Sequence, residues 1–158
     1  RGRRSARRAG SVLAVTDDAA ETAPDGARPA AGRARDGISS FLDFRYPEPG
    51  VIALDVRDDL LNRGGLLSGA VTYAMVDYAM GSALWAQRGE EEGVATLSIS
   101  INYLQTARDG EVVCRAQVDR RNRTAATLRA TVEAQDGRLL ATAIGSYSIF
   151  PIERYRRG

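Results

Sequence analysis

One long apolar segment limits what this chain can fold into more than any other feature. From Ala70 to Ala86 the only charged residue is Asp77, and the apolar positions would cover nearly the whole circumference of a helix. A helix of this kind is buried on most sides, so the rest of the chain has to surround it. We expect it to run from about Leu66 to Gln87, which is about 30 Å at ~1.5 Å per residue.

The segments around this helix alternate apolar and polar residues with the period of two that is typical of β-strands. Two short strands, 41–46 and 51–57, are expected before the helix, separated by the turn residues 47–50. Four longer strands are expected after it, at 95–104, 111–120, 124–134 and 139–150, with tight turns at residues 109–110 and 136–137. The simplest packing is an α+β fold in which a curved antiparallel sheet wraps around one helix.

The strand at 95–104 shows this alternation most clearly. We expect Thr96 on the polar face of the sheet together with Ser98 and Ser100. Leu97 and Ile99 are expected on the opposite, apolar face.

The composition excludes several kinds of chemistry. The sequence contains no histidine, which excludes a Ser-His-Asp or Cys-His catalytic unit and a His-ligated metal site. We expect no metal and no redox cofactor. Cys114, the only cysteine, lies in an alternating strand pattern and is expected to be a buried residue rather than a nucleophile. A chain that cannot form an intrachain disulfide fits a reduced, cytoplasmic setting.

Charge divides the chain into three parts. Residues 1–35 carry eight arginines and four acidic residues, residues 36–150 carry eleven arginines and fifteen acidic residues, and residues 151–158 carry three arginines and one acidic residue. We expect a flexible N-terminal extension at 1–35, a folded domain at 36–150 and a basic tail at 151–158. The acidic balance of the domain argues against nucleic-acid binding, and no segment is long and apolar enough to span a membrane.

Asp77 is the first candidate for function. A carboxylate is costly to bury unless a neighbour hydrogen-bonds it or the protein uses it as a base, and an apolar wall makes it a stronger base. A turn of small residues, 62–69, leads into the helix, whose first amides can bind a negative oxygen. Tyr73 shares the helical face of Asp77. The residues alone leave open whether Asp77 is catalytic or only bonds a hydroxyl group such as that of Tyr73.

The segment from about Phe41 to Phe150 resembles the phenylacetate-degradation (PaaI-type) acyl-CoA thioesterases, which have the hot-dog fold. The family pattern is Asn, Gly, His-Gly-Gly and a helical Asp, and it corresponds here to Asn62, Gly65, the tripeptide 68–70 and Asp77. Residues 96–110 are similar to the family strand that ends in a Tyr-Leu-x-x-Ala-x-x-Gly turn. Asn122-Arg123-Thr124 matches a position that usually reads Gly-Arg or Gly-Lys.

The resemblance implies hydrolysis of an acyl-CoA thioester without a cofactor. Asp77 would be the general base or nucleophile, and the backbone N–H of Gly69 would bind the thioester carbonyl. Asn62 would orient water or substrate, and Thr96 would touch the attacking water. In the family the acid and the oxyanion donor come from different subunits, which implies a homodimer or a homotetramer built as a dimer of dimers. The further candidates for substrate binding are Gly65, Tyr73, Asn122, Arg123 and Thr124, and arginines 120, 121 and 123 could meet the phosphates of CoA.

Two positions depart from the family pattern. The family histidine is Ser68 here, and the second glycine is Ala70. Serine donates and accepts hydrogen bonds but cannot hold a proton near neutral pH. Three hypotheses therefore stay open: an acyl-CoA thioesterase that includes Ser68 in its site, a non-catalytic acyl-CoA-binding protein, and a thioesterase acting on carrier-protein thioesters.

Overall fold

The computed structural model describes residues 36–154; the predicted N-terminal extension and the end of the predicted C-terminal tail lie outside the described residues. None of the described helices is both long enough and apolar enough to cross a membrane. Two short 3-10 helices, Asp58–Leu60 and Ile152–Arg154, accompany the main elements. In chain order these are α1 (Gly37–Phe41), β1 (Arg45–Glu48), β2 (Val51–Asp55), α2 (Gly69–Trp85), β3 (Glu92–Tyr103), β4 (Glu111–Arg121), β5 (Ala125–Ala134) and β6 (Leu139–Pro151).

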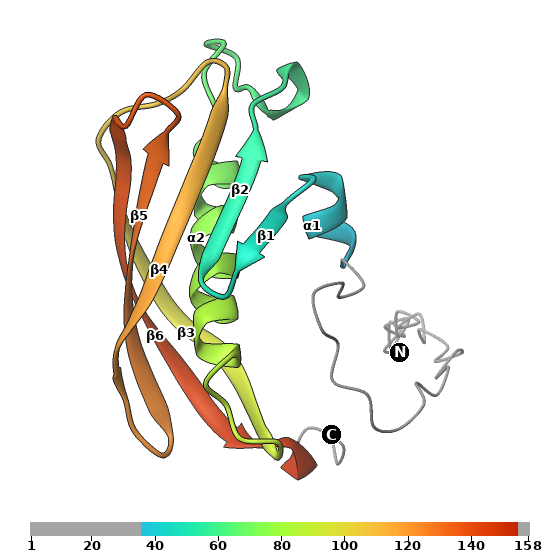
Figure 1. The fold of residues 1–158 in the computed structure, drawn as a ribbon, viewed down its shortest axis with the longest axis vertical. Coiled ribbons are helices and arrows are strands. Elements are labelled where there is room, and N and C mark those ends of the chain that lie inside the picture. The colour runs from blue at the N-terminus through green and yellow to red at the C-terminus, as the bar shows by residue number, and fades with distance from the viewer. Residues whose placement is uncertain (1–35, 155–158) are drawn as a thin grey trace, which may run out of the picture. The chain divides into compact units, whose positions relative to one another are not determined.

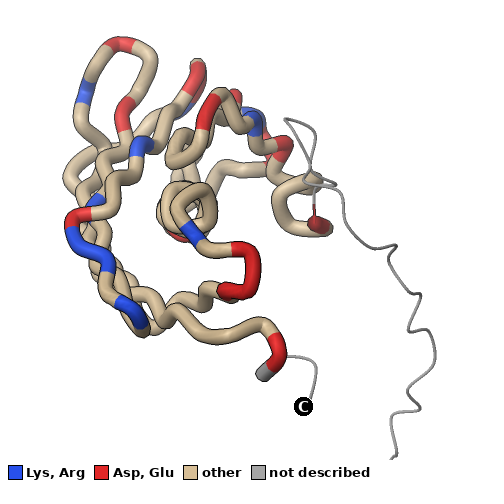
Figure 2. Tube along the Cα trace, turned by 60° about the horizontal axis from the view of Figure 1, so that its bottom comes forward, with Lys and Arg blue, Asp and Glu red and all other residues tan. Residues whose placement is uncertain are grey.

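The six strands form one antiparallel sheet in the order β1-β2-β4-β5-β6-β3. The sheet bends around α2, which lies along its inner face (Figure 1). Figure 2, which looks more nearly along α2, shows the strands curving around the helix. The predicted α+β architecture, the hot-dog fold, is confirmed.

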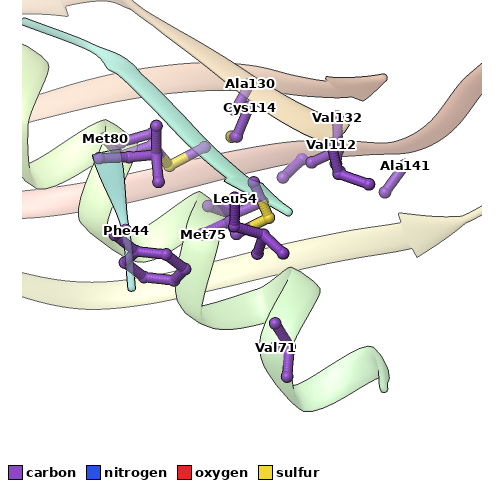
Figure 3. Packing of buried hydrophobic residues seen from close by; sticks show 14 of the residues in the cluster. Phe44, Leu54, Val71, Met75, Met80, Val112, Cys114, Ala130, Val132 and Ala141 are labelled. Carbon is purple, nitrogen blue, oxygen red and sulfur yellow. The ribbon is translucent and has the colours of Figure 1, made fainter. Parts of the chain in front are cut away.

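One stripe of α2 fills the concave side of the sheet. Its buried residues recur three and four positions apart, as expected for one face of a helix: Val71, Thr72, Met75, Val76, Ala79, Met80, Ala83 and Leu84. Figure 3 shows this cluster, in which side chains of α2 pack against those of the strands. A fully buried residue such as Leu54 or Met75 stabilises the fold by roughly 1.5–3 kcal/mol.

The opposite face of α2 stays partly open. Ala70 and Tyr73 are exposed, and Asp77 and Gly81 are half-buried. The prediction that the helix is buried on most sides is therefore wrong for a single chain. This open face carries Asp77 and the small residues around it.

The N-terminal elements differ from the prediction. The strand expected at 41–46 begins late, because Phe41 is the last residue of α1. The Asp36 carboxylate caps this helix by accepting hydrogen bonds from the N–H groups of Ile38 and Ser39, at 3.0 and 2.9 Å. Asp43 then adopts a left-handed conformation, with φ of 53°, and the strand begins only at Arg45.

The long helix also begins later than predicted, at Gly69 instead of Leu66. Leu67 forms an isolated β-bridge with Leu61, and its N–H donates to the carbonyl of Ala107 at 2.8 Å. These bonds hold residues 66–68 in an extended conformation up to the first turn of α2.

Candidate active site

The Asp77 carboxylate is held at one of its two oxygens. The Thr96 hydroxyl donates to Oδ1 at 2.8 Å, and the Tyr147 hydroxyl donates to the same oxygen at 2.9 Å. The Tyr147 hydroxyl also lies 3.3 Å from the main-chain carbonyl oxygen of Asp77. No group among residues 36–154 hydrogen-bonds Oδ2. One oxygen is therefore anchored, and the other is free to accept a proton or to attack a substrate.

A β-bulge in β3 brings Thr96 to this position. Thr96 pairs with Tyr147 on β6, whereas the next pair is Ser98 with Ser146, so Leu97 is the extra residue. The bulge places Thr96 on the inner face of the sheet and leaves Leu97 63% exposed. The prediction that Thr96 shares the outer, polar face with Ser98 was wrong, because one extra residue reverses the alternation.

Tyr147 was not predicted as a site residue. The inner row of β6 otherwise consists of Ala141, Ala143, Gly145 and Ile149, so its hydroxyl is the only side-chain polar group in that row. Tyr147 is 1% exposed, and a buried tyrosine hydroxyl normally has a hydrogen-bond partner. The signal was therefore present: a phenol on a buried strand face, opposite a helix with a lone carboxylate. Burial, reinforced by the charge of Asp77, raises the pKa of Tyr147 well above its usual range, so the phenol stays protonated and remains a donor.

The start of α2 offers two backbone donors. Ser68 caps the helix with extended backbone, and its hydroxyl makes no capping bond. The N–H groups of Val71 and Thr72 donate to the Ser68 carbonyl at 3.0 and 3.2 Å. Those of Gly69 and Ala70 have no acceptor among the described residues. Two free amides at the positive end of a helix suit an oxyanion.

Asn62 shapes the turn that leads to these amides. Its side-chain carbonyl accepts from the N–H groups of Gly64 and Leu66, at 2.8 and 3.4 Å. Gly65 completes the turn with φ of +69°, a left-handed conformation that favours glycine. The side-chain amide nitrogen of Asn62 has no acceptor within residues 36–154, so it can donate to a ligand. No contact in this chain joins Asn62 to Asp77.

The two halves of the candidate site are well separated within one chain. Eight residues of helix divide Gly69 from Asp77, which corresponds to ~12 Å along the axis. A reacting carbonyl has to lie about 3 Å from both its oxyanion donor and the attacking group. Asp77 and Gly69 of the same chain therefore cannot act on one carbonyl group.

Tyrosines line the space between the two halves. Tyr73 lies one turn before Asp77 and is 39% exposed. The Tyr103 hydroxyl donates to the Gly69 carbonyl at 3.0 Å, which ties the end of β3 to the helix start. Burial, followed by the influence of Tyr73, raises the pKa of Tyr103, so the Tyr103 phenol is neutral.

Within residues 36–154, no hydrogen bond or ion pair joins the turn 122–124 to Asp77. All three of its residues are exposed, and the Thr124 carbonyl accepts from the N–H of Ile149 at 2.9 Å, two residues beyond Tyr147. Arg121 forms an ion pair with Glu92. Arg120 and Arg123 form no ion pair within the described part of the chain.

Other groups are not arranged for chemistry. Cys114 is fully buried on β4, as predicted, and burial raises the pKa of its thiol to about 12. Among residues 36–154, no three His, Cys, Asp or Glu side chains are grouped as metal ligands would be. Asp77 also forms no ion pair within this range.

Comparisons with known proteins agree with this architecture. The sequence model of the thioesterase superfamily matches residues 64–141, from the turn before α2 to the start of β6. A relative from Saccharolobus solfataricus that is named as an esterase is 29% identical over 118 residues, which cover 72% of this chain and 84% of that protein.

Solved structures give the same result. The conserved protein PA5202 of Pseudomonas aeruginosa is 28% identical with a TM-score of 0.69, covering 73% of this chain and 95% of the other. The BH2602 protein of Bacillus halodurans, solved with CoA, shares the fold at 17% identity with a TM-score of 0.71, covering 75% of this chain and 78% of the other. Residues 64–141 therefore match the thioesterase superfamily, whose general chemistry is the hydrolysis of acyl thioesters, and the chain has the hot-dog fold.

Proposed function

We propose that this protein is a PaaI-type acyl-CoA thioesterase that hydrolyses an acyl-CoA to a free acid and CoA. The observation that carries the proposal is the Asp77 carboxylate: two hydroxyl groups anchor one of its oxygens, and the other has no hydrogen-bond partner within residues 36–154. The match of Asn62, Gly65, Gly69 and Asp77 to the family pattern supports the same assignment.

The geometry fits general-base catalysis. Oδ2 of Asp77 removes a proton from water as the water oxygen attacks the thioester carbon. The carbonyl oxygen becomes an oxyanion and accepts hydrogen bonds from the N–H groups of Gly69 and Ala70 at a helix start. When the tetrahedral intermediate collapses, the C–S bond breaks and the proton held by Asp77 passes to the departing sulfur. Direct attack by Oδ2 through an acyl-aspartyl anhydride is the nucleophilic alternative.

A complete site needs two copies of the chain. The separation of ~12 Å along α2 means that the Asp77 of one copy works with the helix start of another. β3 is an edge strand of the sheet, its Leu97 and Tyr103 are exposed, and Tyr103 contacts the start of α2. An unpaired edge of this kind favours strand pairing with a second copy. The proposed assembly is therefore a homodimer, or a homotetramer formed from two such dimers.

The substrate side of the proposal rests on charge and exposure. Arg123 and Arg120 are exposed at the turn between β4 and β5 and have no acidic partner among the described residues, so they can meet the phosphates of CoA. CoA is present in the Bacillus halodurans structure of the same fold. Asn122 and Thr124 would bind the same part of the substrate, and Tyr73 would line the acyl side. A cytoplasmic location remains part of the proposal and rests on the lone buried Cys114.

A screen of aromatic and aliphatic acyl-CoA substrates tests the proposal, with release of free thiol as the readout. We expect turnover of at least one substrate class, and Asp77→Ala should reduce kcat by about a hundredfold or more, as for a positioned base. Asp109→Ala, at an exposed turn, is the matched control and should keep the wild-type rate. Wild-type turnover by Asp77→Ala would overturn the assignment.

Ser68 and Ala70 favour a second candidate, a protein that binds acyl-CoA without hydrolysing it. Ser68, at the position of the family histidine, cannot hold a proton near neutral pH, and Ala70 adds a methyl group at the position of the second glycine. Calorimetric binding of acyl-CoA with no thiol release at any chain length would establish this candidate. Hydrolysis restricted to acyl groups on a carrier protein would instead identify a carrier-protein thioesterase.

A further inference from the structure

Two hydroxyl groups on neighbouring strands converge on one oxygen of Asp77. Thr96 of β3 and Tyr147 of β6 are direct partners in the antiparallel register. Their hydroxyls reach Oδ1 at 2.8 and 2.9 Å, from positions 19 and 70 residues away in the sequence. The register of β3 and β6 therefore places both donor hydroxyls beside Oδ1, which accepts a hydrogen bond from each.

The ring of Tyr147 is fixed more firmly than the side chain of Thr96. Tyr147 is 1% exposed and pairs with Ala126 of β5 on its other side, whereas Thr96 is exposed on an edge strand. Gly145, two residues earlier, leaves room for the ring: a Cβ there would lie 3.3 Å from Cε2 of Tyr147 and 2.7 Å from Sδ of Met80. The Tyr147 hydroxyl also lies 3.3 Å from the main-chain carbonyl oxygen of Asp77, so it contacts both the side chain and the backbone of this residue.

We propose that Tyr147 is a positioning residue that fixes Oδ1 of Asp77 and so directs Oδ2 toward the thioester. The proposal rests on the proposed role of Asp77. A hydroxyl donor bonds an ionised carboxylate more strongly than a protonated one, so removal of the Tyr147 hydroxyl disfavours the ionised form of Asp77.

Few other described groups lie close enough to the Asp77 carboxylate to affect its position or its charge. Within residues 36–154 the groups that hydrogen-bond it are the Thr96 hydroxyl of β3 and the Tyr147 hydroxyl of β6, and Tyr73 lies one turn before it on α2. The Tyr78 hydroxyl, also on α2, donates instead to the carboxylate of Asp36, at 2.7 Å. No arginine forms an ion pair with Asp77 within residues 36–154.

The test compares Tyr147→Phe with Tyr78→Phe in the full-length protein. Each variant removes one phenol hydroxyl that donates to a carboxylate, from Asp77 in the first case and from Asp36 in the second. For Tyr147→Phe we expect kcat to fall about tenfold with KM within a factor of two, and the acid limb of the kcat/KM profile to move up by about one pH unit. Tyr78→Phe should keep both the rate and the acid limb of the wild type.

A titration that needs no turnover separates this proposal from the proposed function. Carboxyl ¹³C resonances of aspartate-labelled protein are followed against pH, and Asp77→Asn identifies the Asp77 signal. In Tyr147→Phe that signal should titrate at higher pH than in the wild type. An unchanged Asp77 titration together with an unmoved acid limb would overturn the positioning role. If the wild type hydrolyses no thioester, the proposed function fails, and the titration still decides the role of Tyr147.

A second substitution covers the case in which Tyr147→Phe does not fold. Replacement of Tyr147 by 3-fluorotyrosine keeps the ring and hydroxyl but makes the hydroxyl a stronger donor. The Asp77 titration and the acid limb should then move to lower pH, opposite to the effect of removing the hydroxyl. A shift in the same direction as Tyr147→Phe, or none at all, would contradict the proposal.

Discussion

The two halves of the candidate site are built in different ways. The helix start at 62–70 is shaped mainly by local contacts, in which Asn62 bonds its own turn and Ser68 accepts from the first turn of α2. Two longer-range bonds, from Tyr103 to Gly69 and from Leu67 to Ala107, tie it to the end of β3 and the loop that follows. The Asp77 half is made of contacts between α2, β3 and β6, up to 70 residues apart in sequence. The first half depends on turn geometry, and the second depends on strand register. Substitutions can disturb each half separately.

The largest effect is expected where the sheet approaches α2. Gly145→Ala places a methyl group 2.7 Å from Sδ of Met80, so either the buried Met80 side chain or the backbone around it has to shift. Overpacking of this kind costs about 1–3 kcal/mol in the free energy of unfolding, measured by urea denaturation at fixed protein concentration. Thioesterase activity should fall with it, because Tyr147 lies two residues along the same strand.

Ile144→Val is the matched control for this change. Ile144 is the neighbouring residue on the outer face and is 66% exposed, so its substitution should alter the unfolding free energy by less than about 0.5 kcal/mol. Equal stability losses in the two variants would show that close packing at Gly145 is not what sets the position of β6.

A smaller effect on activity is expected from Thr96, which lies at the β-bulge of β3 in the same half of the site. Thr96→Val keeps the shape of the side chain but removes a hydrogen bond to a charged oxygen, which is worth about 1.5 kcal/mol, or roughly tenfold in kcat. Ser98→Ala removes a hydroxyl on the outer face, where it bonds Ser146 at 2.9 Å, and should leave kcat unchanged. Similar kcat values for Thr96→Val and Ser98→Ala would mean that the orientation of the Thr96 side chain toward α2 does not matter for catalysis.

The smallest effect is expected at the local half. Gly65 has φ of +69° and open space around its Cα, so Gly65→Ala carries a backbone cost alone, about 1 kcal/mol in the free energy of unfolding. Gly37→Ala, in α1, also meets nothing within 4 Å but needs no left-handed backbone. It should be neutral or slightly stabilising in the same urea denaturation. A neutral Gly65→Ala would show that the turn before α2 tolerates another conformation.

Much of the fold follows from local patterns. The period of two in the strands and the uncharged segment around Asp77 predicted a curved sheet around one helix, and the four C-terminal strands lie close to their predicted bounds. The wrong predictions for the N-terminal elements also have local causes, which the pattern of apolar residues does not reveal. Asp36 caps a helix that was not predicted and that takes up Phe41, and Asp43 adopts a left-handed conformation before β1.

The candidate site was predictable to a different degree in each half. Asn62, Gly65, Ser68 and Gly69 are neighbours in the sequence, so their spacing alone predicted one turn and one helix start. Tyr147 was missed because its partner lies on another element and nothing near it in the sequence indicates Asp77. The placement of Thr96 was wrong because the bulge at Leu97 leaves no mark in the alternation of residues.

The sequence by itself therefore determined the kinds of elements, their order, and the presence of one carboxylate in an apolar helix. These depend on periodicity and turn chemistry, which act over a few residues. Only the tertiary structure decided which oxygen of Asp77 is anchored, which face Thr96 occupies, and that Tyr147 reaches the same carboxylate. These depend on strand register, where a single extra residue exchanges the two faces of a strand.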